Sequence, residues 1–498
     1  MKRLFLTLAL GALAVFGLNS CSDDDSDKGP EKRPYCEIEK FSVSVPNVEA
    51  KIDKDKALVE LYVTPDVLEL LSDVKPTGEL SIGATVVPTF SVSQDFTKEV
   101  TYLVTAEDGK TQKTWTVKPV VSKYVASGIG SVKRFWVKTA KDLGIGVGEP
   151  TIAVFGDKVI ISRPGKIVDG ETGEPTGEFL NVEGIATEAA DAWHSPFIVA
   201  NDSKGNLLGA TLGTYIKPVP WQVFRWKSLE AAPEKVLEHS MTDTEDFGRS
   251  LEIVGDIDGN ALLLAYNINE ANIGKKGGAV EPAAAPAAHY CWKVTNGVLA
   301  QKAELVAVPA GYRSGDAFQM LWPASELATK PFYWCDRGNA AASPITRIGY
   351  VGLDDQIVYI KGGVDPNDIP GGTDNKDNMF KEHGYGRKVL QIKPFTFNGL
   401  NYLAACTYFS METPDYSEDK IYLYTQLIEV SGKDSKVVYL GKDVFAGKMS
   451  ALDPNGTGGI AVSVVAEGSG EDEGKLSCRV YNLLSGVGMV AYDITNVK

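Results

Sequence analysis

Aromatic and acidic residues near the predicted strands of the C-terminal part are the side chains best suited to ligand chemistry. Flat ring faces stack on the C–H faces of sugars, while neighbouring carboxylates and amides bind hydroxyl groups, and binding sites combine such apolar surfaces with a few polar groups. Most of the candidates stand between strand-like runs, and two belong to the segment FYWCDR. The candidate glycan-binding residues are Trp193, His194, Trp221, Trp322, Tyr333 and Asp336.

The competing interpretation is that these aromatic side chains fill a core between packed sheets, and we favour it for each residue taken singly. Trp226 lies inside a strand-like run, and Trp115 alternates with Thr114 and Thr116, so both tryptophans are expected in the core. The candidates above are therefore a hypothesis about a site.

No sequence motif predicts catalysis. The chain contains neither H-E-x-x-H nor G-x-S-x-G, and its four histidines stand apart from one another. A glycoside hydrolase needs two carboxylates about 5–10 Å apart. The acidic residues that could converge in such a pair are Asp157, Asp316, Asp336 and Asp354. The sequence does not place them together, so we assign no catalytic residue and favour a protein without enzymatic activity.

Three segments raise the question of a cofactor. Residues 256–260 (DIDGN) begin like a calcium-binding EF-hand loop, but Asn267 stands where such a loop needs a glutamate, so a turn is favoured. Residues 363–378 are rich in carboxylate and amide oxygens, yet their Pro, Gly and Asn content equally predicts an exposed loop. GIGVG (144–148) lacks the strand–turn–helix context of a phosphate site. No cofactor is expected, with calcium as the alternative.

Charge and cysteine content exclude several classes of protein. The 498 residues carry a formal net charge of −15, which argues against nucleic acid as a partner and against adsorption on an anionic bilayer. Six cysteines are spaced widely and irregularly, unlike a disulfide framework or a zinc site. Cys406 and Cys478 lie in strand-like runs, so we expect buried free thiols there.

The first 35 residues predict an export signal followed by a tether. Lys2 and Arg3 precede an apolar run that ends at Leu18, shorter than the roughly 20 residues of a membrane span, so residues 1–20 are predicted to be a signal peptide. The segment LNSC resembles a bacterial lipobox, although Asn19 departs from the usual residue type. That resemblance implies lipidation of Cys21.

The acidic run after the lipobox indicates where the protein is located. SDDDSD (22–27) resembles the lipoprotein export signal of the Bacteroidetes, which implies an outer-membrane lipoprotein exposed at the cell surface. Like charges repel one another and keep a segment extended, and Pro30 and Pro34 stiffen the chain beyond the acidic run. Residues 21–35 are therefore expected to form a tether, and the lipid is expected to be the only membrane contact.

Residues 36–122 predict an immunoglobulin-like β-sandwich. Short runs rich in β-branched and aromatic residues recur between turn signals, Asp108-Gly109 predicts a tight hairpin, and residues 66–72 predict a short helical crossover. GATVVPTFSVSQDFTKEVTYLVTAEDGKTQKTWTV (83–117) resembles a family of β-sandwich domains of unknown function that follow the lipid anchor in Bacteroidetes surface lipoproteins. That resemblance implies a spacer or adaptor.

Residues 125–498 show a repeating pair of strand-like segments and almost no helical period. NLLGATL with QVFRWKS, NALLLAY with HYCWKV, LNYLAACTYF with DKIYLYTQLIEV, and GGIAVSVVAE with GKLSCRVYNL recur about every 45–65 residues, which predicts four-stranded blades. We therefore expect an all-β chain ending in a β-propeller of about six blades, with two larger β-sandwiches as the alternative. Residues 247–266 and VFRWKS resemble a propeller-like C-terminal domain of Bacteroidetes lipoproteins.

The expected function follows from the predicted cellular location and the predicted domain architecture together. The predicted lipid anchor and the two all-β domains together indicate a surface lipoprotein. We expect its propeller face to bind a glycan without cleaving or modifying it. The alternatives are a polysaccharide-active enzyme and a protein-interaction scaffold at the cell surface, so the expected partner is a glycan or a surface protein.

Overall fold

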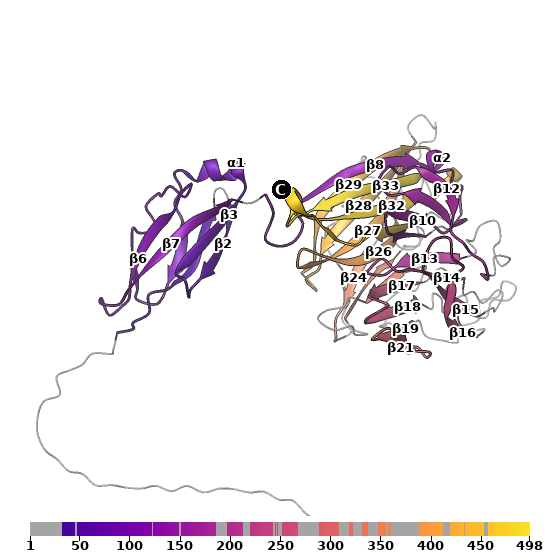
Figure 1. The fold of residues 1–498 in the computed structure, drawn as a ribbon, viewed down its shortest axis with the longest axis horizontal. Helices are drawn as coiled ribbons and strands as arrows, with labels where there is room; N and C mark the ends of the chain where they lie inside the picture. The colour runs from indigo at the N-terminus through magenta and orange to yellow at the C-terminus, as the bar shows by residue number, and fades with distance from the viewer. Residues whose placement is uncertain are drawn as a thin grey trace, which may run out of the picture. The chain divides into compact units, whose positions relative to one another are not determined.

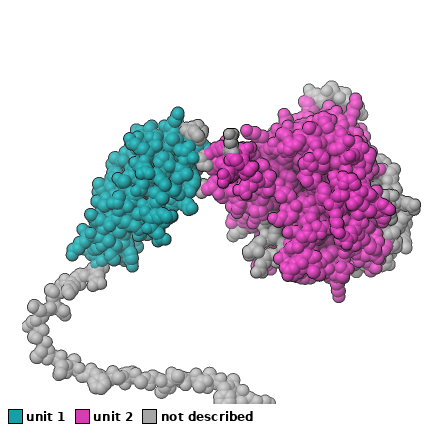
Figure 2. Space-filling model, viewed as in Figure 1, with its two compact units in different colours: residues 1–122 teal, residues 123–498 magenta. Residues whose placement is uncertain are grey.

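The computed structural model divides the chain into two compact units, residues 1–122 and residues 123–498 (Figures 1 and 2). The sequence-based boundaries were 36–122 and 125–498. The structure describes residues 32–44, 47–121, 123–148, 151–185, 197–212, 220–242, 245, 247, 251–266, 288–307, 318–321, 331–336, 347–354, 357–359, 388–411, 419–432, 434–452 and 457–498. Among these residues, no helix is both long and apolar enough to cross a membrane.

The described part of the first unit contains seven strands joined in the order β4-β1-β2-β3-β7-β6-β5. They are β1 (Ile38–Ser44), β2 (Asn47–Asp53), β3 (Leu58–Val63), β4 (Thr77–Leu80), β5 (Thr85–Val87), β6 (Val100–Thr105) and β7 (Gln112–Val121). Strand β1 pairs with β4 through its first part and with β2 through its last residues, so it passes from one layer to the other. The result is the expected β-sandwich.

Aromatic side chains from both layers of the sandwich fill its core. Phe41 on β1 meets Tyr102 on β6 and Phe96 edge-to-face, with ring centroids 6.1 and 5.9 Å apart. Trp115 is fully buried, as predicted, and its indole N–H donates to the carbonyl oxygen of Cys36 at 3.1 Å. A buried indole N–H usually finds such a partner, and here the bond fixes the ring between the layers.

Two local predictions in this unit are confirmed. Helix α1 (Pro65–Leu68) and the 3₁₀ turn η1 (Glu69–Leu71) connect β3 to β4. The β6–β7 hairpin turns at Asp108, whose carboxylate accepts the backbone N–H groups of Lys110 and Thr111, while Gly109 takes a φ of 71°. A glycine adopts that left-handed conformation at little cost, which is why Asp-Gly marks the turn.

The described residues of the second unit form six sheets, each with four strands in its main path. Their innermost strands are β9 (Ile152–Phe155), β13 (Phe197–Asn201), β17 (Glu252–Gly255), β22 (Phe318–Leu321), β26 (Lys388–Phe397) and β30 (Gly458–Val462). Each of these strands contacts the next in turn, and β30 contacts β9, so the sheets are the blades of a closed ring. The predicted propeller and its blade number are confirmed.

The outer strands complete the six blades in chain order. Blades one to three continue with β10 (Lys158–Ile161), β11 (Lys166–Asp169) and β12 (Pro175–Phe179); β14 (Leu207–Thr211), β15 (Trp221–Trp226) and β16 (Glu234–His239); and β18 (Ala261–Tyr266), β19 (Ala288–Thr295), β20 (Val298–Leu299) and β21 (Glu304–Ala307). Blades four and five continue with β23 (Phe332–Asp336), β24 (Arg347–Val351) and β25 (Ile357–Tyr359); and β27 (Leu400–Met411), β28 (Lys420–Glu429) and β29 (Lys436–Ala446).

The sixth blade closes the ring by combining the two ends of the unit. It contains β30, β32 (Leu476–Leu484), β33 (Gly488–Thr495) and, as its outermost strand, β8 (Ser131–Thr139), with β31 (Ala466–Glu467) paired to β32. Strand β8 comes from the start of the unit and pairs antiparallel with β33 at its end (Figure 1). Because the two ends of the ring share a sheet, opening it would break a full strand pairing.

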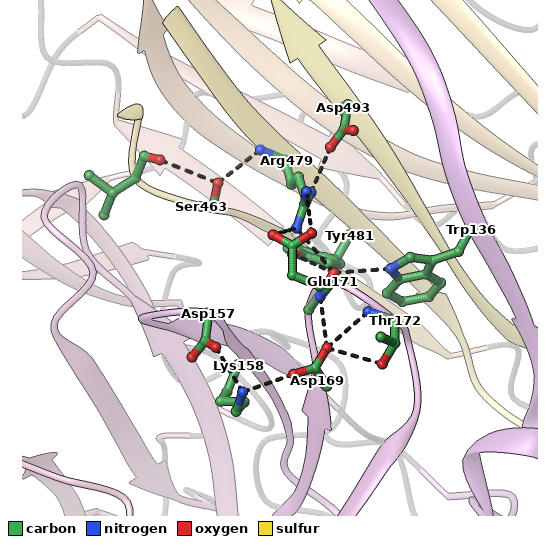
Figure 3. A network of polar contacts seen from close by, with 12 residues as sticks. Trp136, Asp157, Lys158, Asp169, Glu171, Thr172, Ser463, Arg479, Tyr481 and Asp493 are labelled. Atoms are coloured by element: carbon green, nitrogen blue, oxygen red, sulfur yellow. Dashed lines mark hydrogen bonds and ion pairs between the residues drawn. The ribbon is translucent and has the colours of Figure 1, made fainter. Parts of the chain in front are cut away.

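A polar network joins the sixth blade to the first (Figure 3). The guanidinium group of Arg479 on β32 binds both carboxylate oxygens of Glu171, at 2.7 and 3.0 Å, and its Nε donates to Asp493 at 2.6 Å. The carbonyl oxygen of Gly170 also accepts the indole N–H of Trp136 on β8, at 3.0 Å. The β11–β12 hairpin is therefore fastened to the blade that closes the ring.

The repeated segment pairs of the sequence correspond to inner blade strands. In the second, third and fifth blades they are the second and third strands, such as β14 with β15, and in the sixth they are β30 and β32. All five residues of β13, β14 and β30 are buried, since both faces of a blade pack on neighbours. Continuous apolar runs, and not period-two alternation, are therefore the sequence signal of these strands.

Candidate ligand site at the propeller axis

A cavity of about 370 Å³ opens at one end of the propeller axis. It is lined by residues 201–204, 253–255, 393–396 and 462–465. These segments are the carboxyl-terminal parts of the innermost strands β13, β17, β26 and β30 with the residues that come after them. Four blades therefore contribute to one pocket, which we call the axial pocket.

A buried ion pair lies at the axial pocket. Lys393, which lines the pocket, donates from Nζ to the carbonyl oxygen of Asn201 at 2.8 Å and lies 3.8 Å from Oε2 of Glu252. The side chains of Lys393 and Glu252 are only 7% and 3% exposed. Burial raises the pKa of Glu252 and lowers the pKa of Lys393, while the opposite charge of each partner works against these shifts.

Amide side chains extend this pair into a network around the axis. Gln391 donates to Oε1 of Glu252 at 2.6 Å and accepts the backbone N–H of Ile460 at 2.9 Å. Asn201 accepts the N–H of Val154 at 3.0 Å and donates to the carbonyl oxygen of Val462 at 3.1 Å. Side chains therefore connect the innermost strands of five blades, and buried polar groups of this kind specify one arrangement of the strands.

The rim of the axial pocket is partly apolar. The half-buried ring of Phe395 stacks on Tyr402 with centroids 5.4 Å apart. Val464 is 43% exposed and lines the pocket together with the exposed residues Ser203 and Lys204. Phe395 and Val464 supply an apolar wall, and the lysine and serine supply hydrogen-bond donors. An amphipathic ligand of modest size suits such a surface.

Asp202 shapes the pocket but has little capacity left for a ligand. One carboxylate oxygen accepts the N–H groups of Lys204 and Asn206 at 2.8 and 2.9 Å, and the other accepts the N–H of Ile257 at 2.9 Å and the side-chain amide of Asn206 at 2.9 Å. These bonds hold two loops of the rim. Lys393, whose ammonium group carries three donors, is the lining side chain with hydrogen-bonding capacity for a ligand. Oε2 of Glu252 has no hydrogen-bond partner among the described residues, but it is a buried atom outside the pocket lining.

Two of the predicted glycan-binding residues are core residues, which corrects the sequence-based expectation. Trp221 is 0% exposed and stacks on Trp292 with centroids 5.2 Å apart, in the core shared by the second and third blades. Tyr333 is 1% exposed, and its hydroxyl accepts the N–H of Gly432 at 3.1 Å. Neither ring offers a face to a ligand, because both fill space between blades. Trp226 is buried as predicted, and its indole donates to Asn181.

The remaining predicted residues are not brought into a site by the described structure. Trp193, His194, Trp322 and the lipidation site Cys21 lie outside the described residues, as do Asp316 and the oxygen-rich segment 363–378. Asp336 ends β23, but its side chain is likewise outside the described part. These predictions stand as predictions.

The DIDGN and GIGVG segments are a turn and a loop, as favoured. Asp256 accepts the N–H of Asp258 at 2.9 Å, and Asp258 binds both terminal nitrogens of Arg225 at 2.6 Å. Gly144 ends the short helix α2 (Ala140–Leu143). Within the parts of the chain that the structure describes, no three His, Cys, Asp or Glu side chains are grouped to hold a metal ion. Cys478 is a buried free thiol, and Cys406 is also buried.

Asp157, one of the carboxylates considered for hydrolysis, belongs to an ion-pair cluster (Figure 3). Lys158 lies 2.8 Å from Asp157 and 2.9 Å from Asp169. Hydrogen bonds from Lys158 and Thr172 lower the pKa of Asp169 to about 2. A general acid needs a raised pKa, so Asp169 is set up as a structural anion, and Asp157 is an ion-pair partner of the same lysine.

Sequence reasoning missed the polar residues of the axis. Gln391 and Lys393 alternate with apolar residues in KVLQIKPFTF, and Glu252 is the one charged residue of LEIVG. A charge inside a buried strand was the available signal, because such residues are rarely buried without a partner. Their partners lie in other blades, so the sequence did not show which residues meet.

A comparison with protein-family models finds a match for the first unit. Residues 38–118 match the family model described as "SGBP, N-terminal", and the members of that family are surface glycan-binding proteins of the Bacteroidetes. The matched segment covers nearly the whole described sandwich. A comparison with curated protein sequences finds no match.

Comparisons of the fold return several solved β-propeller-like proteins at low similarity. A subtype N11 neuraminidase-like protein of A/flat-faced bat/Peru is 9% identical over 76% of this chain and 96% of its own, with a TM-score of 0.34. The hemagglutinin-neuraminidase of Parainfluenza Virus 5 is 10% identical over 76% and 99%, with a TM-score of 0.33. A quinonprotein alcohol dehydrogenase-like protein from Bacteroides thetaiotaomicron is 10% identical over 74% and 91%, with a TM-score of 0.23.

The six-bladed architecture rests on the strand pairing of this chain itself, and these distant structures say nothing of its ligand. The first unit, by contrast, is similar over residues 38–118 to the N-terminal domain of the surface glycan-binding proteins.

Proposed function

We propose that this protein is a cell-surface lipoprotein that binds a glycan in the axial pocket of its propeller without altering it chemically. The observation that carries the proposal is the match of residues 38–118 to the N-terminal domain of surface glycan-binding proteins. The lipobox-like LNSC and the acidic run after it support an outer-membrane anchor at Cys21. In this proposal the sandwich is a spacer, and the lipid is the only membrane contact.

The chemistry of the axial pocket supports a saccharide as its ligand. Sugars combine apolar C–H faces with hydroxyl groups that donate and accept hydrogen bonds. Phe395 and Val464 provide apolar surface, Lys393 and Lys204 provide donors, and the hydroxyls of Ser203 and Ser463 can donate or accept. A few polar groups within an apolar lining are the usual composition of small-molecule sites.

Binding without hydrolysis fits the described carboxylates better than catalysis does. A glycoside hydrolase uses two carboxyl groups about 5–10 Å apart, one as acid and one as base or nucleophile. Glu252 is buried with a raised pKa, which suits an acid, but the oxygens of Asp202 are already taken up by backbone and amide donors. Trp193, His194, Trp322 and Asp336 remain proposed additional contacts to the glycan.

A binding assay on a glycan panel tests the proposal. Calorimetry and affinity gels with host and plant polysaccharides should reveal binding by the protein without its first 21 residues. Phe395→Ala should weaken that binding about five- to tenfold, because the ring contributes roughly 1 kcal/mol of stacking. The matched control is Phe179→Ala, which removes an exposed ring of β12 outside the pocket. No binding to any glycan would refute the proposal, and release of reducing ends would replace it with an enzyme.

The anchor is tested separately in cells. Labelling with a palmitate analogue should mark the wild-type protein and not the Cys21→Ala variant. Protease added to intact cells should then degrade the wild-type protein. An unlabelled wild type would contradict lipidation, and complete protection from protease would contradict surface exposure.

A further inference from the structure

A second cavity, of about 250 Å³, lies at one end of the sixth blade and shares no lining residue with the axial pocket. Strands β8 and β33, the segment 472–475 and the ends of the unit enclose it. We call it the lysine pocket, because lysines predominate among its charged side chains. Those side chains are Lys123, Lys133, Lys475 and Lys498 with Asp472 and Asp493.

Among the side chains that line the lysine pocket, four lysines outnumber two aspartates. Asp493 accepts Nε of Arg479 at 2.6 Å, so its charge is shared with a guanidinium group (Figure 3). Asp472 lies 3.6 Å from Lys475 and 3.9 Å from Lys123, at the long end of ion-pair distances. In a chain with a net charge of −15, this concave cluster of ammonium groups is a local site for an anion.

The other polar groups of the lysine pocket limit which anions it can bind. The hydroxyls of Ser131 on β8 and Thr495 on β33 lie 2.9 Å apart and add donors and acceptors. The oxygens of Asp472 can accept hydrogen bonds from hydroxyl groups, but they repel a ligand made only of anionic oxygens. A sulfate or a phosphomonoester dianion brings no donor for the Asp472 carboxylate and carries two negative charges, whereas a sugar acid brings several hydroxyl donors and a single negative charge.

We propose that the lysine pocket binds an acidic sugar residue that carries one carboxylate, a uronate. Its carboxylate meets the ammonium groups of Lys133 and Lys475, and its hydroxyls donate to Asp472. This inference rests on the proposed function, since it adds an acidic subsite to a glycan-binding propeller. Because the two pockets share no lining residue, the uronate belongs to a part of the glycan that the axial pocket does not hold.

Calorimetry with galacturonate oligosaccharides and their neutral galactose counterparts tests the inference. We expect the wild type to bind the acidic series in low salt and to lose affinity as NaCl rises, because partly exposed ion pairs are screened. The double variant Lys133→Met/Lys475→Met should bind the acidic series about tenfold more weakly, as expected for lost charge-assisted hydrogen bonds. Lys141→Met removes an exposed lysine from α2, outside the pocket, and should change nothing.

The outcomes separate this inference from the proposed function. Binding of neutral glycans that the double variant retains, together with weakened uronate binding, would support an acidic subsite on a folded protein. Binding of neutral glycans with no preference for uronates would overturn the inference alone, whereas failure to bind any glycan would overturn the proposed function as well. Two further outcomes would overturn the inference of a uronate site. One is equal competition by inorganic sulfate, and the other is lysine-dependent binding to vesicles with anionic lipid in place of uronate.

Discussion

Nζ of Lys393 on β26 lies 3.8 Å from Oε2 of Glu252 on β17, and this buried pair joins the fifth blade to the third at the propeller axis. A buried ion pair costs desolvation on both sides, and it adds little stability beyond what apolar residues of the same volume provide. Lys393 also lines the axial pocket, where its ammonium group has donors to spare, so ligand binding explains the pair better than stability does.

Removing one member of the pair should be more damaging than removing both. Lys393→Met leaves Glu252 buried without its counter-charge, and we expect a loss of about 3–5 kcal/mol in the free energy of unfolding. Lys393→Met combined with Glu252→Gln should recover a large part of that loss, because no lone charge remains. Urea denaturation of the wild type, the single variant and the double variant measures these free energies of unfolding. Equal stability of the single and double variants would show that the two side chains are not coupled.

His289 should make the propeller sensitive to mild acid. Its ring is fully buried beside Phe332, with centroids 4.8 Å apart, and burial lowers its pKa from 6.5 to about 3. The unfolded chain gains this proton below pH 6.5 and the folded chain does not, so folding stability falls with pH by up to about 1.4 kcal/mol per unit between pH 6.5 and 3.

The His289→Phe variant should lose that part of the pH dependence. Denaturation midpoints measured at steps from pH 7 to pH 4 give the slope for both proteins. A variant with the same slope as the wild type would show that other groups cause the acid sensitivity. Glu245, whose pKa is held at about 2, adds its own loss of stability only below pH 4.5, so the slope between pH 6.5 and 4.5 reports on His289 without it.

The Arg479 network should stabilise the closed ring. Arg479→Met leaves Glu171 and Asp493 without their guanidinium partner at the join between the sixth and first blades. Because the arginine is about one fifth exposed, the expected loss is modest, roughly 1–2 kcal/mol, and it should shrink in high salt. Lys436→Met, which breaks an exposed pair with Glu429, is the control and should change stability by less than about 0.5 kcal/mol. Urea midpoints at low and high salt compare the two, and equal effects would contradict a special role for the join.

Trp221 should matter for stability and not for ligand binding. Trp221→Ala opens a cavity in the core that the second and third blades share, so we expect a loss of about 3–5 kcal/mol. The affinity of the folded fraction for a glycan should stay unchanged. Thermal unfolding and calorimetry below the transition separate the two effects. A specific loss of affinity in a fully folded variant would restore the interpretation of Trp221 as a contact residue.

The sequence by itself determined the class and the order of the elements. Turn chemistry at Asp108-Gly109 and the apolar runs of β14 and β18 are local signals, legible without the rest of the chain. They were sufficient to predict an N-terminal sandwich, a propeller of about six blades, and buried positions for Trp115 and Trp226. Such features depend on a few neighbouring residues, and those residues are adjacent in the chain.

Only the tertiary structure decided which residues meet across the ring. The pairing of β8 with β33 joins the two ends of a unit, and the contact between Glu252 and Lys393 joins two blades that are not neighbours in the chain. The rings of Trp221 and Tyr333 have the same chemistry as rings that stack on sugars. They are core residues only because the fold buries them between blades. Contacts of this range are set by the closure of the whole ring, so no local stretch of sequence encodes them separately.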